Sequence, residues 1–498
     1  MAIETELKLR LSPTDLACLR RHGVFKLHRI TDPVTRRLHN IYYDTPELNL
    51  HQSHMALRLR RVGGRWLQTL KGGGAIQGFH QRNEWEVPVV TAKLDFSGLD
   101  GAVWDKYLPL AWRDILKPVF VTDFYRTSQD LLWQGSRIEV CMDKGVIKTS
   151  QSRVALCEVE LELKSGDPLH LFEFAKILLG IVPLEMEVVS KAEQGFRLLS
   201  AYVPHPVPGV LPQLGLNLTD SLKASIWSCL QHFQRNLSGA MIGDDAEYLH
   251  QLRLALRRLR FTLRLVVLQD PVLTRLRGEF SVVGKMLGEA REWDVLVAGT
   301  IVPLQMQLKD ELEQQNLQAL LECCQLRRAC RYSALRLRSR ELQELLLELC
   351  IWMHGSYWQH AVQDEPELSD FARHNLQKAY RQFMKLSAQL DNTQQLHQLR
   401  IAVKKLRYRV MFFSGLYDEQ QVKHYIFALS DIQDVLGNIH DISIANSLLD
   451  EIVFEQLAIS DAVVMVKRVL NRDAHYKTKE IKQAVKRVFD SRRFWNVS

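Results

Sequence analysis

Charged side chains stand at every second position in several short stretches of the first 200 residues. The first stretch, residues 3–11, reads IETELKLRL and places Glu4, Glu6 and Lys8 at alternate positions, with the apolar Ile3, Leu7 and Leu9 beside them. Because alternate side chains of a strand share one face, these three groups would point the same way. Later stretches repeat the pattern at Arg58, Arg60, Lys71, Arg82, Glu84, Glu86, Arg137, Glu139, Asp143, Glu158, Glu160, Glu162 and Lys164.

Two interpretations of these ionic faces stay open at this point. For a single strand, the simpler one is the solvent side of a sheet whose other side covers the core. Nearly all the positions, however, are Glu, Arg or Lys, whereas a solvated face usually mixes in Ser, Thr, Gln and Asn. The second interpretation is a β-barrel whose ionic faces point inward and line a charged tunnel.

An inward ionic lining has a defined chemistry. Clustered carboxylates suit hard divalent cations such as Mg²⁺ or Mn²⁺. Arg and Lys side chains opposite them neutralise phosphoryl oxygens, Arg through two parallel hydrogen bonds. Together these groups predict a site for a metal-bound chain of phosphates, where hydrolysis needs mainly charge stabilisation and an aligned water.

The elements that position this lining are predicted to be short strands. Gly, Pro and Asp turns separate many of the alternating stretches, which predicts a mostly antiparallel β domain over residues 1–202. Residues 170–182, HLFEFAKILLGIV, have the apolar character of a helix that covers the outside of such a barrel. Four prolines within 203–217 favour an extended linker. The predicted strands are 3–11, 55–62, 65–73, 80–89, 136–145 and 157–166.

Beyond the linker, long amphipathic runs predict an all-α domain over residues 218–498, so the fold class is an α+β multidomain protein. The run LHQLRLALRRLRFTLRL from residue 249 recurs as LHQLRIAVKKLRYRVMF from residue 396. This duplication predicts two related helical bundles. The closing segment, residues 472–495, is basic and is predicted to be a helical extension.

Each repeat carries a basic stripe at helical steps of three and four. One interpretation is a solvated helix face. The recurrence of the stripe in both repeats favours anion binding instead, because a line of like charges repels itself unless an anion or acidic residues lie beside it. Asp294 and Asp441 are candidate internal counter-charges, and Arg258 and Lys405 widen the stripes. No aromatic residue is expected along the stripes, which argues against nucleic acid as a partner. The stripes are His250, Arg253, Arg257, Arg260, and His397, Arg400, Lys404, Arg407.

Composition sets further limits. A chain of 498 residues with 46% hydrophobic content can bury the cores of two domains, and a net charge of +8 favours anionic partners. The sequence contains neither a signal-like N-terminus nor an apolar run long enough to cross a bilayer, so we expect a cytoplasmic protein without a membrane partner. Eight scattered cysteines, Cys323, Cys324 and Cys330 among them, are expected to be reduced core thiols.

The sequence resembles a known family. The segment ETELK at 4–8 matches the ExExK motif of the CYTH superfamily, the triphosphate tunnel metalloenzymes, and the match continues in order over residues 1–200. The motifs that carry it are MALRLRR, TLKGG, FHQRNEWEV, TDFYRT, GSRIEVCMDKG, CEVELELKSG and VVSKAEQGFRL. Residues from about 218 to 440 resemble the CHAD domain. The whole chain is therefore similar to bacterial inorganic triphosphatases in which a CYTH domain precedes a CHAD domain.

The resemblance implies roles for particular residues. In the catalytic group Glu4, Glu6 and Lys8, the two glutamates would hold one or two divalent metals, Mg²⁺ or Mn²⁺, and Lys8 would bind triphosphate. The other implied metal ligands are Glu84 or Glu86, and Glu160 with either Glu158 or Glu162. Glu139 and Asp143 are either ligands or ion-pair partners of the arginines. The other implied substrate-binding residues are Arg58, Arg60, Lys71, Arg126, Arg137 and Lys191.

The resemblance leaves three functions to compare. The first is hydrolysis of inorganic triphosphate, with inorganic polyphosphate bound on the helical stripes. The second is a CYTH enzyme that acts on a nucleotide or thiamine triphosphate, as a cyclase or phosphatase. The third is a non-catalytic polyphosphate-binding protein. The CHAD half favours the first over the second, and the intact ExExK motif with the glutamate-rich strand opposes the third.

Overall fold

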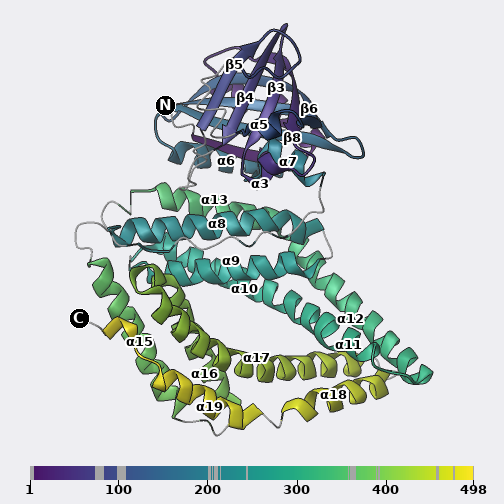
Figure 1. The fold of residues 1–498 in the computed structure, drawn as a ribbon, viewed down its shortest axis with the longest axis vertical. Helices are drawn as coiled ribbons and strands as arrows, with labels where there is room; N and C mark the ends of the chain where they lie inside the picture. The colour runs from purple at the N-terminus through teal and green to yellow at the C-terminus, as the bar shows by residue number, and fades with distance from the viewer. Residues whose placement is uncertain are drawn as a thin grey trace. The chain divides into compact units, whose positions relative to one another are not determined.

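The structure, a computed structural model, divides the chain into two compact units (Figure 1). The first comprises Met1–Pro204 with Ser339–Gly355, and the second comprises His205–Arg338 with Ser356–Ser498. The sequence-based division had placed residues 339–355 in the helical domain. The residues described are 5–72, 83–97, 108–199, 204, 206, 211–213, 215–242, 245–267, 269–356, 358, 366–388, 390, 393–455, 459–474 and 477–496.

The first unit contains one nine-stranded antiparallel sheet, which confirms the predicted β architecture. Its strands follow the order β5-β4-β3-β2-β6-β7-β8-β1-β9, and the sheet curves strongly (Figure 1). Within the described residues, β5 and β9 are the two ends of this hydrogen-bonded order. The strands are β1 Thr5–Arg10, β2 Val34–Asp44, β3 Ala56–Val62, β4 Arg65–Gly72, β5 Asn83–Val89, β6 Lys117–Trp133, β7 Ser136–Lys148, β8 Arg153–Ser165 and β9 Glu185–Glu187.

The strand register gathers the ionic positions on one face of this sheet. Lys8 lies opposite Glu160, and on the neighbouring pair of strands Arg126 lies opposite Asp143. The other face is apolar where helices cover it: Leu9, for example, is fully buried. Helices α1, α2 and α6 contact β8, β6 and β1. The helices of this unit are α1 Pro13–Arg21, α2 Gly23–His28, α3 Asn49–Gln52, α5 Leu110–Arg113, α6 Leu169–Ile181, α7 Lys191–Arg197 and α13 Ser339–His354.

Helix α7 packs on the ionic face, beside its charged part. Phe196 of α7 joins an apolar cluster with Tyr42, Phe120 and Phe124, whose side chains lie on the same face as Arg126. The ring of Phe120 lies edge-on to Phe196, with their centroids 5.0 Å apart. This cluster fixes the helix whose first residue is Lys191.

The second unit is all-α and repeats its helix order, as the duplicated sequence predicts. Helix α9 contacts α8 and α10, and its repeat α16 contacts α15 and α17 in the same way. Phe261 of α9 packs against Tyr408 and Phe412 of α16. The elements are α8 Leu218–Ile242, α9 Ala246–Leu265, α10 Pro271–Leu296, η1 Val297–Ile301, α11 Val302–Gln305, α12 Glu311–Leu337, α15 Leu368–Ser387, α16 Thr393–Phe412, η2 Phe413–Leu416, α17 Glu419–Glu455, α18 Ser460–Ala474, α19 Lys477–Asp490 and η4 Phe494–Asn496.

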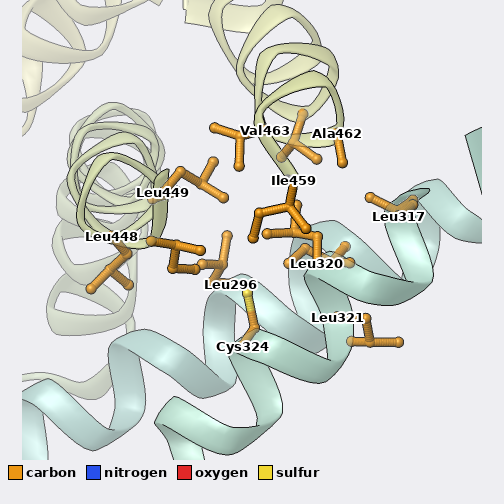
Figure 2. Close-up of a cluster of buried hydrophobic side chains, with 14 of the residues drawn as sticks. Leu296, Leu317, Leu320, Leu321, Cys324, Leu448, Leu449, Ile459, Ala462 and Val463 are labelled. Atoms are coloured by element: carbon orange, nitrogen blue, oxygen red, sulfur yellow. The ribbon is translucent and has the colours of Figure 1, made fainter. Parts of the chain in front are cut away.

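The two repeats share an apolar core, shown in Figure 2. Leu296, Leu320 and Cys324 from the first repeat pack with Leu449 and Val463 from the second. Burial of this size, at about 1.5–3 kcal/mol for each large side chain, joins the two bundles into one unit.

Two expectations from composition are answered by the structure. No helix among the described residues is long and apolar enough to cross a membrane. All eight cysteines are free thiols. Cys324 is buried as expected, but Cys323 is half-buried and Cys330 is exposed, because the helix that carries them turns its polar face outward at those positions.

Candidate active site

Three buried carboxylates meet at the centre of the ionic face. Glu158 and Glu160 are alternate residues of β8 and therefore point to the same side, and Asp143 of β7 lies opposite Glu158 in the strand register. One carboxylate oxygen from each lies within 4.8 Å of the other two. This set of hard oxygen donors suits a divalent cation such as Mg²⁺ or Mn²⁺.

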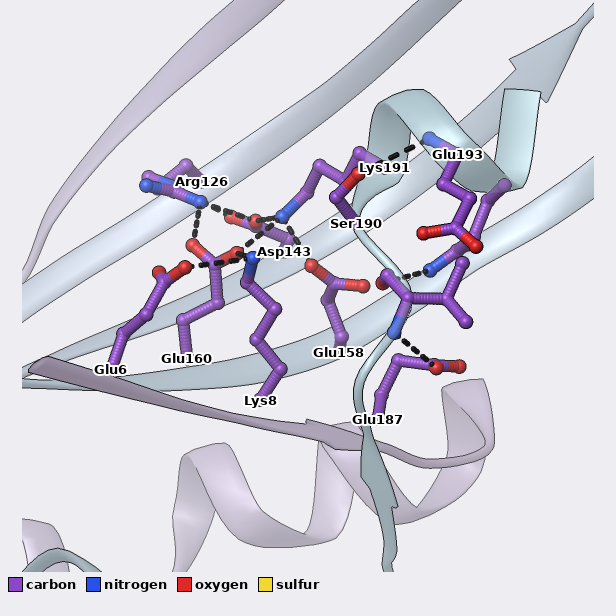
Figure 3. A network of polar contacts seen from close by, with 12 residues as sticks. Glu6, Lys8, Arg126, Asp143, Glu158, Glu160, Glu187, Ser190, Lys191 and Glu193 are labelled. Atoms are coloured by element: carbon purple, nitrogen blue, oxygen red, sulfur yellow. Dashed lines mark hydrogen bonds and ion pairs between the residues drawn. The ribbon is translucent and has the colours of Figure 1, made fainter. Parts of the chain in front are cut away.

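Three cations surround these carboxylates (Figure 3). The Lys191 Nζ atom lies 2.8 Å from oxygens of both Asp143 and Glu160, and it also donates to Glu158. Arg126 donates two parallel hydrogen bonds to Asp143, at 2.8 and 2.7 Å, and another to Glu160. Lys8 Nζ lies 3.9 Å from Glu160 and 2.8 Å from Glu6. Glu160 is thus the carboxylate that all three cations share.

The mutual attraction of these groups outweighs the cost of burying them. Burial by itself would lower the pKa of Lys191, but Glu158, Glu160 and Asp143 raise it above its ordinary value. Burial would likewise raise the pKa of Glu160, but Lys191, Arg126 and Lys8 hold it well below its usual range. Glu160 and Lys191 therefore stay charged at neutral pH, whereas burial raises the pKa of the neighbouring Glu158 above its ordinary value.

The backbone before α7 fixes the position of Lys191. Ser190 is the N-cap of that helix, and its hydroxyl accepts a hydrogen bond from the backbone N–H of Glu193. The half-buried carboxylate of Glu187 accepts another from the backbone N–H of Val189, at 2.8 Å. Lys191 Nζ also lies 5.3 Å from the centre of the Phe124 ring. These contacts direct the ammonium group into the carboxylate cluster.

A second part of the ionic face, on β3, is mainly cationic. Arg58 and Arg60 are alternate residues of this strand, and both face the sheet interior. Arg60 Nε donates to the Asn40 side chain at 2.8 Å, and none of the described carboxylates forms an ion pair with Arg60. Burial and then the charge of Arg58 lower the pKa of Arg60 to about 10. A half-buried guanidinium in this setting favours an anion beside it.

The remaining candidate residues fall at different places. Glu139 and Glu162 both pair with Lys164, at 2.8 and 2.6 Å, so the structure brings Glu158 rather than Glu162 beside Glu160. Glu86 of β5 accepts a hydrogen bond from Thr69.

Arg137 pairs with Asp130, away from the three carboxylates. Lys71 lies opposite Glu84 in the register. Glu4, Arg82 and the side chain of Glu84 lie outside the described residues. Asn40 was not foreseen, because a single amide in an alternating strand carries no distinct signal.

In the second unit, the basic stripe of α9 faces the basic stripe of α16. Burial, followed by the charges of Arg400 and Arg257, lowers the pKa of Lys404 to about 7. Burial and Arg257 lower the pKa of Arg253 to about 10. A cavity of about 450 Å³ opens between the helices, and its lining includes Arg253 and Arg400. The two repeats therefore concentrate positive charge in one place.

The stripe ends are tied to the neighbouring helices. Arg260 donates to Ser281 of α10 at 2.8 Å, and Arg407 donates to Gln433 of α17 at 2.9 Å. His397 lies near His440 of α17, with 5.8 Å between the ring centres. Burial lowers the pKa of His250, so its imidazole is neutral at pH 7.

The predicted counter-charges are only half correct. Asp441 lines the cavity and interacts with Arg400 and Lys404. Asp294 instead points to α12, where it accepts from Arg328 at 2.6 Å and from Tyr332. The acid of the first repeat that lines the cavity is Glu292. When Gly288 is aligned with Gly437, 149 residues further along the chain, Glu292 aligns with Asp441. This alignment is the sequence signal that could have identified Glu292.

Two details of the stripes also differ from the prediction. Phe261 and Tyr408 continue the helical steps after Arg257 and Lys404, and the Arg257 guanidinium lies 5.9 Å from the centre of the Tyr408 ring. Aromatic rings therefore do lie along the stripes, where they pack α9 against α16. Arg258 is close to His232 of α8, whose pKa it helps to lower, and so does not widen the stripe.

Comparison with known proteins places these features in two families. The CYTH domain family matches residues 2–196, and the CHAD domain family matches residues 224–450. A protein from Haemophilus influenzae named inorganic triphosphatase is 33% identical over 204 residues, which is 40% of this chain and 55% of that protein. The chain therefore matches about half the length of this relative.

Two solved structures are similar to separate parts of the chain. The CHAD domain from the plant Ricinus communis is 30% identical, with a TM-score of 0.51, and the similarity covers 59% of this chain and 98% of that one. HpAC1 from Hippeastrum, described with a dominant triphosphatase activity, is 21% identical with a TM-score of 0.29, over 39% of this chain and 95% of that one. The family matches at residues 2–196 and 224–450 show that the chain contains a CYTH domain followed by a CHAD domain.

Proposed function

We propose that this protein hydrolyses inorganic triphosphate to pyrophosphate and phosphate on the ionic face of its CYTH domain, with Mg²⁺ or Mn²⁺. The observation that carries the proposal is the meeting of Asp143, Glu158 and Glu160 with Lys191, Arg126 and Lys8 on one buried face. The cationic pair Arg58 and Arg60 lies on the same face of the sheet. The name of the Haemophilus influenzae relative supports the same substrate.

The residues divide into two roles. Asp143, Glu158 and Glu160, joined by Glu6 and Glu4 of the ExExK motif, would hold the metal. When bound, the metal supplies charge neutralisation for the phosphoryl oxygens and polarises water. Arg58, Arg60 and Lys71 bind the phosphate chain and keep it aligned. Water adds to the terminal phosphorus, the bond to the bridging oxygen breaks, and pyrophosphate leaves.

A phosphate-release screen tests this proposal. The full chain is incubated with tripolyphosphate, long-chain polyphosphate, ATP or thiamine triphosphate, with Mg²⁺, with Mn²⁺ or with excess chelator. We expect release from tripolyphosphate to be fastest and to need a divalent metal. Faster turnover of ATP or thiamine triphosphate would favour the alternative CYTH activities, and no turnover of any substrate would leave only binding.

The Arg60→Gln variant is expected to lose substrate affinity. Hydrogen bonds to charged groups contribute about 1.5–3 kcal/mol, so kcat/KM for tripolyphosphate should fall by roughly 10- to 150-fold. Steady-state kinetics measure this change. The metal concentration that gives half-maximal rate should stay the same, because Arg60 forms no ion pair with any of the three carboxylates.

Arg61→Gln is the matched control. Arg61 is the next residue on β3, it is exposed, and its guanidinium lies 6.0 Å from the centre of the Trp66 ring on the opposite face. Its loss should leave kcat/KM unchanged. A shift in metal requirement without any change in substrate dependence in Arg60→Gln would refute the assignment of Arg60 to the phosphate chain.

We also propose that the CHAD domain binds inorganic polyphosphate along the facing stripes of α9 and α16. The observation behind this proposal is the set of half-buried cations around Lys404. Their mutual repulsion raises the energy of each charge, and a bound anion would lower it. Binding should weaken steeply as salt rises, because each contact releases counterions from the chain. A fragment of residues 216–498 is unsuited to the test, since it would expose the apolar side of α13, which is buried in the first unit.

Polyphosphate affinity is expected to depend on pH through Lys404. Its pKa is about 7 in the free protein, and a bound phosphate chain raises that pKa toward or above the ordinary 10.5. At a pH between the free and bound pKa values, Lys404 takes up a proton when polyphosphate binds. Affinity should therefore fall as pH rises above 7, by at most about tenfold per pH unit. Titrations of the full chain with long-chain polyphosphate, without divalent metal and at constant salt, measure the slope.

Lys404→Arg is the control for this slope. An arginine keeps its charge across the whole range, so the variant should bind polyphosphate with little dependence on pH between 7 and 9.5. The same pH slope in both proteins would rule out Lys404 as its source.

A competition experiment tests the proposed ligand. Retention of single-stranded DNA in preference to polyphosphate at equal phosphate concentration would contradict the choice of polyphosphate as the partner of the CHAD domain.

A further inference from the structure

Helix α13 reaches the edge of the catalytic sheet from a distant part of the sequence. Its residues, Ser339–His354, lie within the span matched by the CHAD family but belong to the first compact unit. It contacts α6 and β9. Glu348 forms an ion pair with Lys176 of α6 at 2.6 Å, and His354 stacks on Phe172, with ring centres 5.1 Å apart. Its buried side chains, such as Leu346 and Leu349, complete the apolar covering of this side.

One polar side chain of α13 is also buried. Gln343 is 2% exposed, and its Oε1 atom accepts a hydrogen bond at 3.1 Å from the backbone N–H of Met186. Met186 is the central residue of β9, which pairs with β1 and ends the sheet. Its N–H donates to Gln343 and therefore points away from β1. A buried edge-strand N–H needs an acceptor, and Gln343 provides it.

The strand that Gln343 holds leads directly to the active site. Glu187 of β9 lies opposite Lys8 in the register of β1, the strand of the ExExK motif. Its carboxylate closes the turn at Val189, Ser190 then caps α7, and Lys191 follows. Lys191 is the fifth residue after Met186 along the chain. At the start of this stretch, β1 pairs with Glu185–Glu187 on one side and Gln343 accepts from the Met186 N–H on the other.

We propose that Gln343 is a positioning residue for Lys191, so that a helix encoded within the CHAD segment sets the geometry of the CYTH active site. The inference rests on the proposed triphosphatase function. Gln343 touches no reacting group and acts by holding β9, and thereby the turn that places the Lys191 ammonium among Asp143, Glu158 and Glu160. The sequence 339–354 is thus part of the catalytic unit.

Gln343→Met tests the proposal in the full chain. Methionine keeps the volume and the apolar contacts but leaves the N–H of Met186 without its acceptor. We expect kcat/KM for tripolyphosphate to fall about tenfold, a change comparable to one unmade buried hydrogen bond. Gln343→Glu keeps an acceptor oxygen at the cost of a buried charge. It should therefore lower the melting temperature but keep KM within about twofold of the wild type.

This contrast separates positioning from general stability. If both variants lose activity in proportion to their loss of melting temperature, Gln343 is only structural and the proposal fails. The double variant Gln343→Met with Lys191→Met gives a second criterion. Because both changes act through Lys191, adding Gln343→Met to Lys191→Met should cause no further loss, and additive losses would overturn the inference.

Two measurements complete the design. Glu348→Gln on the same helix removes the ion pair with Lys176 and should leave the kinetic constants unchanged. Amide hydrogen exchange of residues 185–191 should be faster in Gln343→Met than in the wild type, and equal rates would contradict the proposal. The exchange result does not depend on turnover. If the wild type does not hydrolyse tripolyphosphate, the proposed function fails while the role of Gln343 in holding this segment is still decided.

Discussion

The Glu160→Gln variant should lose nearly all triphosphatase activity, with kcat/KM for tripolyphosphate reduced by at least about 100-fold. Glu160 is the carboxylate shared by Lys8, Arg126 and Lys191, and its oxygens lie with those of Asp143 and Glu158. Glutamine keeps the shape but removes one negative charge from a buried set. Loss of a preorganised charged group at a site of phosphoryl transfer costs about 10²–10³ in rate.

The same variant should also bind metal more weakly. Titration with Mn²⁺ in the absence of substrate measures this effect separately from turnover, because the charge lost belongs to the proposed ligand set. Glu6→Ala is expected to change activity in the same direction, since Glu6 pairs with Lys8 on the same face. Turnover of the wild type in excess chelator would contradict the proposed role of these carboxylates.

Asp123→Asn is the matched control for Glu160→Gln. It breaks an arginine–carboxylate ion pair, with Arg37 at 2.7 Å, on the opposite face of the sheet, where the arginine is exposed. Its activity should equal that of the wild type. If Asp123→Asn and Glu160→Gln lose activity equally, the loss reflects damage to the sheet rather than removal of a catalytic charge.

The Trp495→Ala variant should destabilise the helical unit by about 3–5 kcal/mol, the usual loss for a large aromatic side chain in a core. Trp495 is 1% exposed and packs against Tyr380 of α15 and Tyr425 of α17, with ring centres 6.0 and 5.1 Å away. Its indole N–H donates to Gln377 at 3.3 Å. The basic closing segment therefore ends in an aromatic anchor that ties α15 to α17.

Thermal and urea denaturation of the full chain measure this loss. Arg492→Ala is the control, because Arg492 is exposed three residues before Trp495 and should shift the transition little. Polyphosphate binding by Trp495→Ala should persist at temperatures below its transition. An unchanged transition would mean that the segment does not contribute to the core of the helical unit.

Much of the β unit could be predicted from sequence, for a physical reason that is local. Alternation has a period of two, so Glu158, Glu160 and Arg58, Arg60 must each share a face with their strand neighbours. The stretch at 136–145 was predicted as a strand and lies within β7, Ser136–Lys148. In the helical unit, repetition of a 17-residue segment predicted the duplicated helices α9 and α16 for the same reason.

Choices between equivalent local solutions could not be made in this way. Glu158 and Glu162 have the same relation to Glu160 within β8, and only the cross-strand neighbours distinguish them. Asp143 lies opposite Glu158, whereas Lys164 draws Glu162 and Glu139 together. Similarly, Asp294 and Glu292 are two residues apart on α10, and the neighbouring helices decide which one reaches the cavity.

By itself, the sequence determined which residues share a strand face or a helix stripe, because those relations depend only on the period of the backbone. Tertiary structure alone decided which faces meet, and helix α13 is the clearest example. Its apolar pattern is compatible with either unit, and nothing near Gln343 in the chain indicates Met186, 157 residues away. That contact exists because an unpaired edge strand and an apolar helix α6 both needed covering, and burial of α13 satisfies both at once.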